Sequence, residues 1–282
     1  MIDTISYEFR KYEAIIRRAL EEDIGAGDVT SETILPADLE CEGQLIAKEA
    51  GIIAGLDIAS MTFFAVDANT LFEKAVYDGD YVPAGTVIAK IAGNGRAILG
   101  AERVALNFLQ RMSGIATITN RYVEAIGNHK AIVLDTRKTA PGLRILDKLA
   151  VRLGGGRNHR FGLYDMVLIK ENHVTAAGSI TAAVELVRQN DRKARPIEVE
   201  VTSFAELHEA LSLNVHRIML DNMSLEQMRE AVRIADGRTP LEASGNVSLE
   251  TIAEIAATGV DFISSGSLTH SVKALDISLL LK

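Results

Sequence analysis

The stretch that decides the fold is IEVEVTSFAELHEALSLNVHRIMLDNMSLEQMREAVRIADGRTPLEASG, residues 197 to 245. It contains three short apolar runs of β type, at 197–201, 218–221 and 241–244. Two helical segments separate these runs, because Ser203 with Glu206 and Ser224 with Gln227 both have the spacing of a capping box. Strands that alternate with helices in this way predict parallel β/α units.

The same pattern continues on both sides of this stretch. Further runs of β type lie at 131–135, 166–170 and 261–264, and the last four runs of the chain begin 20 to 23 residues apart. Ser248 is expected to open a helix over 249–255, with Gly259 as its C-terminal stop. Six units do not establish a complete barrel, and an open doubly wound sheet would share the pattern. The polar residues at the strand ends favour a barrel, where those ends converge on one mouth.

The first hundred residues predict a separate, smaller α+β domain. We expect an amphipathic helix over about 7–22, β-rich segments near 43–54 and 71–91, and turns at 78–80, 83–85 and 93–95. A helix is predicted over 102–126, with Val104, Phe108 and Met112 on one face. Arg103 falls on another, polar face of this helix.

Composition excludes several classes of protein. The chain has 282 residues, 48% of them hydrophobic and 24% charged, as in a globular protein with a large core. A net charge of −8 argues against nucleic acid and anionic membranes as partners. The one cysteine, Cys41, excludes an internal disulfide or a zinc–cysteine site, which fits our expectation of a cytoplasmic location. The charges at Asp3, Glu8 and Arg10 argue against an export signal, and no uncharged stretch reaches the ~18 residues of a membrane span.

One segment of this acidic chain is strongly basic. Residues 136–173 hold eight arginines and lysines against three acidic residues, which indicates either a solvated face or a pocket for a small polyanion. Guanidinium groups such as those of Arg137 and Arg160 bind carboxylates in bidentate fashion, whereas lysines such as Lys138 suit phosphate. We expect the cations beside His159 to favour its neutral, hydrogen-bonding form. Lys170 could be a Schiff-base nucleophile, a phosphate ligand or a strand-end charge.

Acidic and small polar residues follow the other strands. Glu198 and Glu200 share one face of their strand, and Glu200 lies nearer its carboxyl end. Glu200 and Asp221 suit sugar hydroxyls, or Mg²⁺ held through water and a substrate's phosphates. The segments 244–246 and 265–267 can offer backbone amides and hydroxyls to a phosphate, which barrels frequently bind at their final strands. Phosphoribosyl pyrophosphate with an acidic acceptor would fill this set of groups.

Seven motifs together resemble one family. They are residues 102–117, 135–139, 154–160, 168–173, 219–223, 241–245 and 268–271. In this order they strongly resemble the quinolinate phosphoribosyltransferase family, from about Glu21 to the C-terminus. The resemblance implies an incomplete seven-stranded α/β barrel over 106–271 and an N-terminal α+β open-sandwich domain over 1–105, completed by about 272–282. It also implies a homodimer with shared active sites; the choice between dimer and hexamer is not readable from the sequence.

The resemblance further implies a reaction and a role for each site residue. Quinolinate and phosphoribosyl pyrophosphate would react, with Mg²⁺ and no organic cofactor, to give nicotinate mononucleotide, pyrophosphate and CO₂ in de novo NAD synthesis. Arg103 would reach the neighbouring subunit's site, and the quinolinate carboxylates would be held by Arg137, His159 and Arg160. Lys138 and Lys170 would face the pyrophosphate, and Glu200 and Asp221 the ribose hydroxyls or the metal, indirectly. The 5′-phosphate would be bound by Ser244, Gly245, Asn246, Ser265, Gly266 and Ser267, with His270 nearby.

Three alternatives stay open at this point. A Schiff-base aldolase or isomerase of barrel type would use Lys170 as its nucleophile. A non-catalytic anion-binding protein would keep the pocket without turnover. A homologue of the same fold associated with molybdenum transport would act on a different substrate, although the complete set of arginines favours quinolinate.

Overall fold

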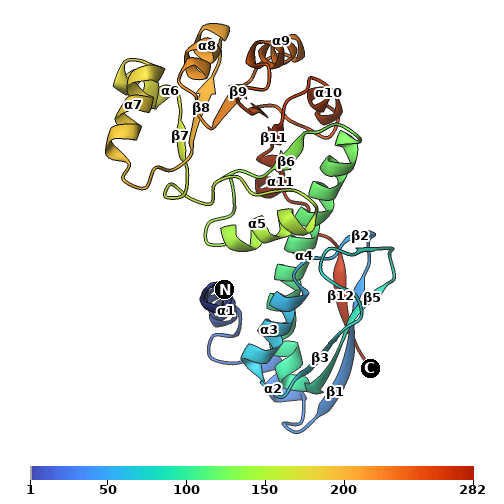
Figure 1. Cartoon of the computed structure of the whole chain (residues 1–282). Helices are drawn as coiled ribbons and strands as arrows, with labels where there is room; N and C mark the ends of the chain where they lie inside the picture. Colours follow the sequence, from blue (N-terminus) through green and yellow to red (C-terminus); the bar gives the residue numbers. More distant parts are fainter. Residues whose placement is uncertain (1) are drawn as a thin grey trace. The chain divides into compact units, whose positions relative to one another are not determined.

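The computed structural model describes residues 2–282, with side chains from Arg10 onward. The chain divides into two compact units, and Figure 1 colours it from its N-terminus to its C-terminus. The first unit comprises the chain up to Ile118 together with Ala140–Gly155 and Val272–Lys282, and the second comprises Thr119–Thr139 and Gly156–Ser271. The domain boundaries predicted above stay a prediction. Among the helices described, none combines the length and the apolar character that a bilayer crossing requires.

The first unit is built on a four-stranded antiparallel sheet with the order β12-β1-β5-β3. These strands are β1 (Glu40–Ala47), β3 (Leu71–Lys74), β5 (Val87–Asn94) and β12 (Ile277–Leu281). β12 pairs with β1 from Gly43 opposite Leu281 to Ala47 opposite Ile277, so the last strand of the chain forms one edge of the sheet. A second, two-stranded sheet joins β2 (Gly51–Ile52) and β4 (Tyr81–Val82). The helices are α1 (Ile2–Ile24), α2 (Val29–Ile34), α3 (Leu56–Val66), α5 (Arg144–Leu153) and the beginning of α4 (Gly95–Ile126).

Helix α4 begins seven residues before the predicted start. The turn predicted at 93–95 is instead a direct passage from β5 into α4, where Asn94 Oδ1 accepts hydrogen bonds from the N–H groups of Arg96 and Ala97. Asn94 thus satisfies two of the donors that a helix start leaves unpaired. The predicted apolar face is correct, since Val104, Phe108 and Met112 are all buried.

The second unit contains a six-stranded parallel sheet with the order β6-β11-β10-β9-β8-β7. Its strands are β6 (Ile132–Leu134), β7 (Val167–Ile169), β8 (Ile197–Val201), β9 (Arg217–Asp221), β10 (Leu241–Ser244) and β11 (Phe262–Ser264), within one residue of the predicted runs. On its other side β6 meets a further segment through a single parallel bridge between Leu134 and Arg157. Six strands plus this bridged segment correspond to an incomplete seven-stranded barrel.

Apart from the end of α4, the helices of this unit follow strands of the parallel sheet, and the last of them comes after β11 (Figure 1). They are α6 (Glu171–Ala177), α7 (Ile180–Asn190), α8 (Phe204–Ser212), α9 (Leu225–Ala235), α10 (Ile252–Ala256) and α11 (Ser267–His270). The capping box of Ser224 and Gln227 is present at α9, with both hydrogen bonds formed.

Two of the predicted helix starts differ from the structure. Ser203 caps α8, but the box predicted there is wrong in its second half, because the Glu206 carboxylate accepts from Thr202 instead. The helix predicted from Leu249 begins at Ile252, because Ser248 and Thr251 first close a separate turn.

Candidate active site

A cavity of about 710 Å³ lies within the second unit, at the carboxyl ends of its parallel strands. It is lined by all the predicted site residues of this unit: Arg137, Lys138, His159, Arg160, Lys170, Glu200, Asp221, Ser244, Gly245, Asn246, Ser265, Gly266, Ser267 and His270. Residues that the sequence did not single out also line it, namely Thr136, Leu168, Met219, Asn222, Glu242, Val247 and Ser264. Arg103 does not line it; this residue is exposed on α4, in the first unit.

The two-residue period of the strands explains why these side chains meet. Side chains two apart on a strand share a face. Met219 and Asp221 on β9 therefore line the cavity together, as do Glu242 and Ser244 on β10. The sequence spacing of Glu198 and Glu200 puts them on one face of their strand but does not say which face. In the structure Glu200 lines the cavity.

Two arginines give the cavity its positive side. Arg137 follows β6 and is exposed, whereas Arg160 is partly buried. Burial, and next the positive charge of Arg137, lower the pKa of Arg160 from its ordinary value. Because like charges repel, a site that keeps two guanidinium groups this close is suited to a ligand with more than one negative charge.

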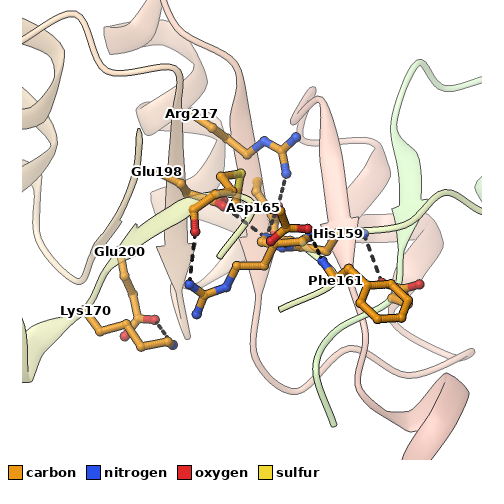
Figure 2. A network of polar contacts seen from close by, with 11 residues as sticks. His159, Phe161, Asp165, Lys170, Glu198, Glu200 and Arg217 are labelled. Carbon is orange, nitrogen blue, oxygen red and sulfur yellow. Dashed lines mark hydrogen bonds and ion pairs between the residues drawn. The ribbon is translucent and has the colours of Figure 1, made fainter. Parts of the chain in front are cut away.

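His159 is almost fully buried and turns both ring nitrogens toward protein groups. Its Nδ1 accepts a hydrogen bond of 2.7 Å from the Arg160 N–H. Its Nε2 lies 2.9 Å from Glu198 Oε2 and 3.5 Å from Glu242 Oε2 (Figure 2). A ring nitrogen that accepts a hydrogen bond carries no hydrogen, so the contact at Nδ1 favours a ring with its hydrogen on Nε2, although Nε2 itself makes no hydrogen bond. The neutral form expected from the sequence stays a prediction.

Two fully buried carboxyl groups lie beside this histidine. Burial raises the pKa of Glu242 to about 7, with the nearby Glu198 as the second cause, and burial likewise raises the pKa of Glu198. Arg217 Nη1 approaches Glu242 Oε2 at 2.9 Å, and its guanidinium stacks 4.1 Å from the centre of the Phe262 ring. Sequence reasoning passed over Glu242 and Arg217, because a charged residue in a β-type run has the same local pattern on either face of the sheet.

Lys170 and Glu200 form an ion pair at the cavity. Lys170 Nζ donates to Glu200 Oε2 over 2.5 Å, and Figure 2 shows the two side chains meeting. Lys170 is about half exposed and Glu200 is mostly buried. A Schiff-base nucleophile needs a free amine, so an ammonium group paired with a carboxylate fits a ligand for phosphate better.

A chain of amide groups supports Asp221. Asn222 Nδ2 donates to Asp221 Oδ2 over 2.9 Å, and Asn246 Nδ2 donates to Asn222 Oδ1 over 3.2 Å. Both asparagines have positive φ, 53° each, a backbone conformation that asparagine tolerates better than most residues. Position 245, directly after β10, requires glycine, because a Cβ there would lie 2.2 Å from Asn222 Oδ1.

The residues predicted for the 5′-phosphate also lie close together. Ser265 Oγ and Ser267 Oγ are 2.7 Å apart. A Cβ on Gly266 would lie 2.8 Å from Lys138 Cδ and 3.0 Å from His270 Cδ2, so the glycine allows both side chains to approach the loop. Thr269 Oγ1 donates to the Lys138 carbonyl and ties the two loops together.

The basic residues of segment 136–173 do not all lie at one site. Arg157 is exposed and does not line the cavity. Arg144, Lys148 and Arg152 belong to α5 in the first unit, where Lys148 is 1% exposed and not a surface charge. Within the second unit, the positive charges at the cavity come from Arg137, Lys138, Arg160 and Lys170.

Comparison with known proteins identifies the family. Residues 28–113 match the N-terminal domain of quinolinate phosphoribosyl transferase, and residues 115–280 match its C-terminal domain. The chain belongs to the quinolinate phosphoribosyltransferase family. This membership confirms the predictions of an incomplete α/β barrel with an N-terminal domain, of an enzyme, and of decarboxylating phosphoribosyl transfer to quinolinate in NAD biosynthesis.

Relatives of the quinolinate phosphoribosyltransferase family resemble the chain over nearly its whole length. Quinolinate phosphoribosyltransferase (decarboxylating) 1b of Nicotiana tabacum is 48% identical, over 95% of this chain and 81% of the relative. The chloroplastic nicotinate-nucleotide pyrophosphorylase (carboxylating) of Arabidopsis thaliana is 49% identical, over 95% and 82%. Among solved structures, NadC from Streptococcus pyogenes is 44% identical with a TM-score of 0.92, covering 95% of both chains. The nicotinate-nucleotide pyrophosphorylase of Francisella tularensis is 43% identical with a TM-score of 0.93, covering 97% and 96%.

Proposed function

We propose that the cavity of the second unit transfers the phosphoribosyl group of phosphoribosyl pyrophosphate to the ring nitrogen of quinolinate. The bond from ribose C1 to pyrophosphate breaks, and a bond from C1 to the nitrogen forms. The adjacent carboxylate then leaves as CO₂, and its electron pair stays on the ring carbon and takes up a proton. The products are nicotinate mononucleotide, pyrophosphate and CO₂. The observation that supports the proposal is that two arginines and two lysines line one cavity together with Glu200 and Asp221.

Arg137 and Arg160 bind the two carboxylates of quinolinate. Each guanidinium group can make paired, charge-assisted hydrogen bonds to a carboxylate. The two guanidinium groups repel each other, and the two negative charges of bound quinolinate offset this repulsion. A positively charged pyridinium nitrogen is itself an electron sink for the decarboxylation, so no organic cofactor is required.

Lys138 and Lys170 bind the pyrophosphate side of the second substrate, and Glu200 and Asp221 face the ribose. Positive charge develops at ribose C1 as pyrophosphate leaves, and carboxylates aimed at that position stabilise it. The ion pair between Lys170 and Glu200 opens when the substrate enters, so that the lysine meets phosphate and the carboxylate meets a ribose hydroxyl. The segments 244–246 and 265–267, with His270, hold the 5′-phosphate.

The acidic residues of the cavity fit Mg²⁺ bound indirectly. Mg²⁺ prefers oxygen ligands and usually keeps several waters. Glu200 already pairs with Lys170 and Asp221 with Asn222, which favours contact through water and the substrate's phosphates over direct ligation. When bound, the ion would neutralise charge on the departing pyrophosphate.

The active form proposed is a homodimer in which Arg103 reaches the partner's cavity. Arg103 and Asn107 are exposed one turn apart on α4, among residues that are buried. An exposed arginine on a long, rigid helix can serve a site in a second copy. The cytoplasm is the compartment proposed, on the basis of the single free thiol of Cys41.

A direct assay tests the proposed reaction. Purified protein is mixed with quinolinate, phosphoribosyl pyrophosphate and Mg²⁺, and CO₂ and nicotinate mononucleotide are measured. Nicotinate serves as the matched substrate, since it lacks one carboxylate. Turnover of quinolinate well above that of nicotinate is expected, whereas a preference for nicotinate would overturn the assignment of the second carboxylate site.

A further inference from the structure

The barrel interior holds a charged cluster to which the proposed reaction gives no part. Glu198 on β8 and Glu242 on β10, here called the buried acid pair, are both 0% exposed. Strand β9 lies between them and brings Arg217 to Glu242. His159 reaches the acid pair from the loop that carries Arg160 (Figure 2). Burying two carboxyl groups is costly, so their presence calls for a function or a compensating partner.

A metal ion is the first occupant to consider. One ligand atom from each of His159, Glu198 and Glu242 lies within 4.8 Å of the others. The direction of the hydrogen bonds argues against an ion, however. Because Nδ1 of His159 accepts the Arg160 N–H, the hydrogen of the neutral ring sits on Nε2, which then has no lone pair for a metal. Arg217 already supplies positive charge to Glu242 at 2.9 Å.

A chain of close contacts leads from the acid pair through His159 to the cavity. Nε2 of His159 lies 2.9 Å from Glu198 and 3.5 Å from Glu242, in contacts that lack hydrogen-bond geometry, and the opposite ring nitrogen accepts the backbone N–H of Arg160. The backbone N–H of His159 itself donates to the buried Asp135 over 2.9 Å. These two hydrogen bonds fix the peptide groups on either side of His159. The next side chain, that of Arg160, lines the cavity.

We propose that Glu198 and Glu242 are positioning residues for the acceptor substrate: they hold the His159 ring so that Arg160 faces the cavity in a fixed orientation. The proposal rests on the proposed binding of quinolinate by Arg137 and Arg160. Without this anchor, repulsion from Arg137 would favour arrangements in which Arg160 turns away from the cavity. The acid pair therefore acts on quinolinate binding and leaves the phosphoribosyl pyrophosphate site unaffected.

Steady-state kinetics of two Glu198 variants test this role. Glu198→Leu removes the carboxylate that lies 2.9 Å from Nε2, and we expect the KM for quinolinate to rise about tenfold. The KM for phosphoribosyl pyrophosphate should stay unchanged. Glu198→Gln keeps an acceptor oxygen and should restore most of the quinolinate affinity. Equal quinolinate KM values in the wild type and Glu198→Leu would overturn the proposal.

A matched control separates positioning from general loss of stability. Glu209 on α8 accepts hydrogen bonds from Thr181 N and Oγ1, and it does not line the cavity. Glu209→Leu also removes a carboxylate from the second unit, and its KM for quinolinate should equal that of the wild type. A rise equal to that of Glu198→Leu would show that the effect is unspecific and would overturn the proposal.

A spectroscopic measurement on the wild type tests the orientation of the His159 ring directly. The ¹⁵N shifts of the histidine rings at neutral pH report which nitrogen carries hydrogen, and His159→Gln identifies the signal of His159. His216 is an internal reference, because its Nδ1 also accepts a backbone N–H, from Ile197 at 3.0 Å. We expect hydrogen on Nε2 of His159. Hydrogen on Nδ1, or a doubly protonated ring, would overturn the proposal.

The two proposals fail in different ways. A wild-type protein that does not convert quinolinate would refute the proposed function. An active wild type with an unaffected Glu198→Leu variant would refute only the positioning role of the acid pair.

Discussion

Glu242→Gln should change how the stability of the protein depends on pH. Glu242 is fully buried, and its pKa rises from an ordinary 4.5 to about 7 on folding. Between these two pH values the folded state keeps a proton that the unfolded chain has released. Stability therefore falls as the pH rises through this range, and is level above it. Glutamine has the same shape and does not ionise, so this contribution disappears in the variant.

The magnitude follows from the two pKa values. A tenfold change in proton affinity corresponds to ~1.4 kcal/mol, so ionisation of Glu242 should cost the folded protein about 3 kcal/mol between pH 4.5 and 7. The group is almost completely buried, so solvent screening reduces this value little. Relative to the wild type, Glu242→Gln should therefore gain about 3 kcal/mol of stability when the pH is raised from 4.5 to 8.

Urea unfolding followed by circular dichroism, at half-unit steps from pH 4.5 to 8, measures this difference. Only the difference between the two proteins is interpreted, because other groups titrate in the same range. Glu230→Gln is the control: this partly exposed glutamate has its pKa lowered by the hydrogen bond with Arg233, so its contribution to stability does not fall as the pH rises. Parallel curves for the wild type and Glu242→Gln would refute the reasoning that burial holds a proton on this carboxyl group.

Four further predictions concern the cavity. Arg137→Ala should raise the KM for quinolinate about 10- to 150-fold, the equivalent of ~1.5–3 kcal/mol for a charge-assisted hydrogen bond, and Arg137→Lys should not restore it; unchanged kinetics would contradict the carboxylate assignment. Asn246→Asp places an acceptor against Asn222 Oδ1 and should lower kcat without lowering the melting temperature, which a thermal scan beside the assay would check. Gly245→Ala should lose most activity, because its φ of 95° and the 2.2 Å approach to Asn222 leave no room for a Cβ; an active variant would show that the loop adapts. Lys170→Ala should weaken phosphoribosyl pyrophosphate binding, and borohydride with a carbonyl compound should trap no adduct on the wild type.

The strand pattern and the strand ends were predictable from the sequence, because a parallel β/α unit has a fixed local signature. An apolar run such as 197–201 indicates a strand, and the residues at or just after the end of each run lie at the same edge of the sheet. The residues placed at the cavity mouth, such as Asp221 and Ser244, follow from this rule. The start of α4 was missed because its cap, Asn94, also belongs to a turn signal, and local sequence does not decide between the two.

The charged interior was not predictable, because burial depends on how the sheet closes. A glutamate on a strand has the same local pattern whether it faces solvent or the inside of a barrel. Glu242 and Arg217 come into contact because β9 and β10 are neighbouring strands in the folded sheet. Lys148 shows the same limit: it counts as a basic residue in the sequence, and the structure buries it in the first unit.

The pairing of β12 with β1 has a consequence for synthesis on the ribosome. The two strands are separated by almost the whole chain, since Ala47 pairs with Ile277. At ~5–20 residues per second, translation of the intervening segment takes about 10 to 50 s, during which one side of β1 has no partner strand. An open β edge can recruit another nascent chain, so this hazard ends only when the segment that contains β12 has been synthesised and has paired.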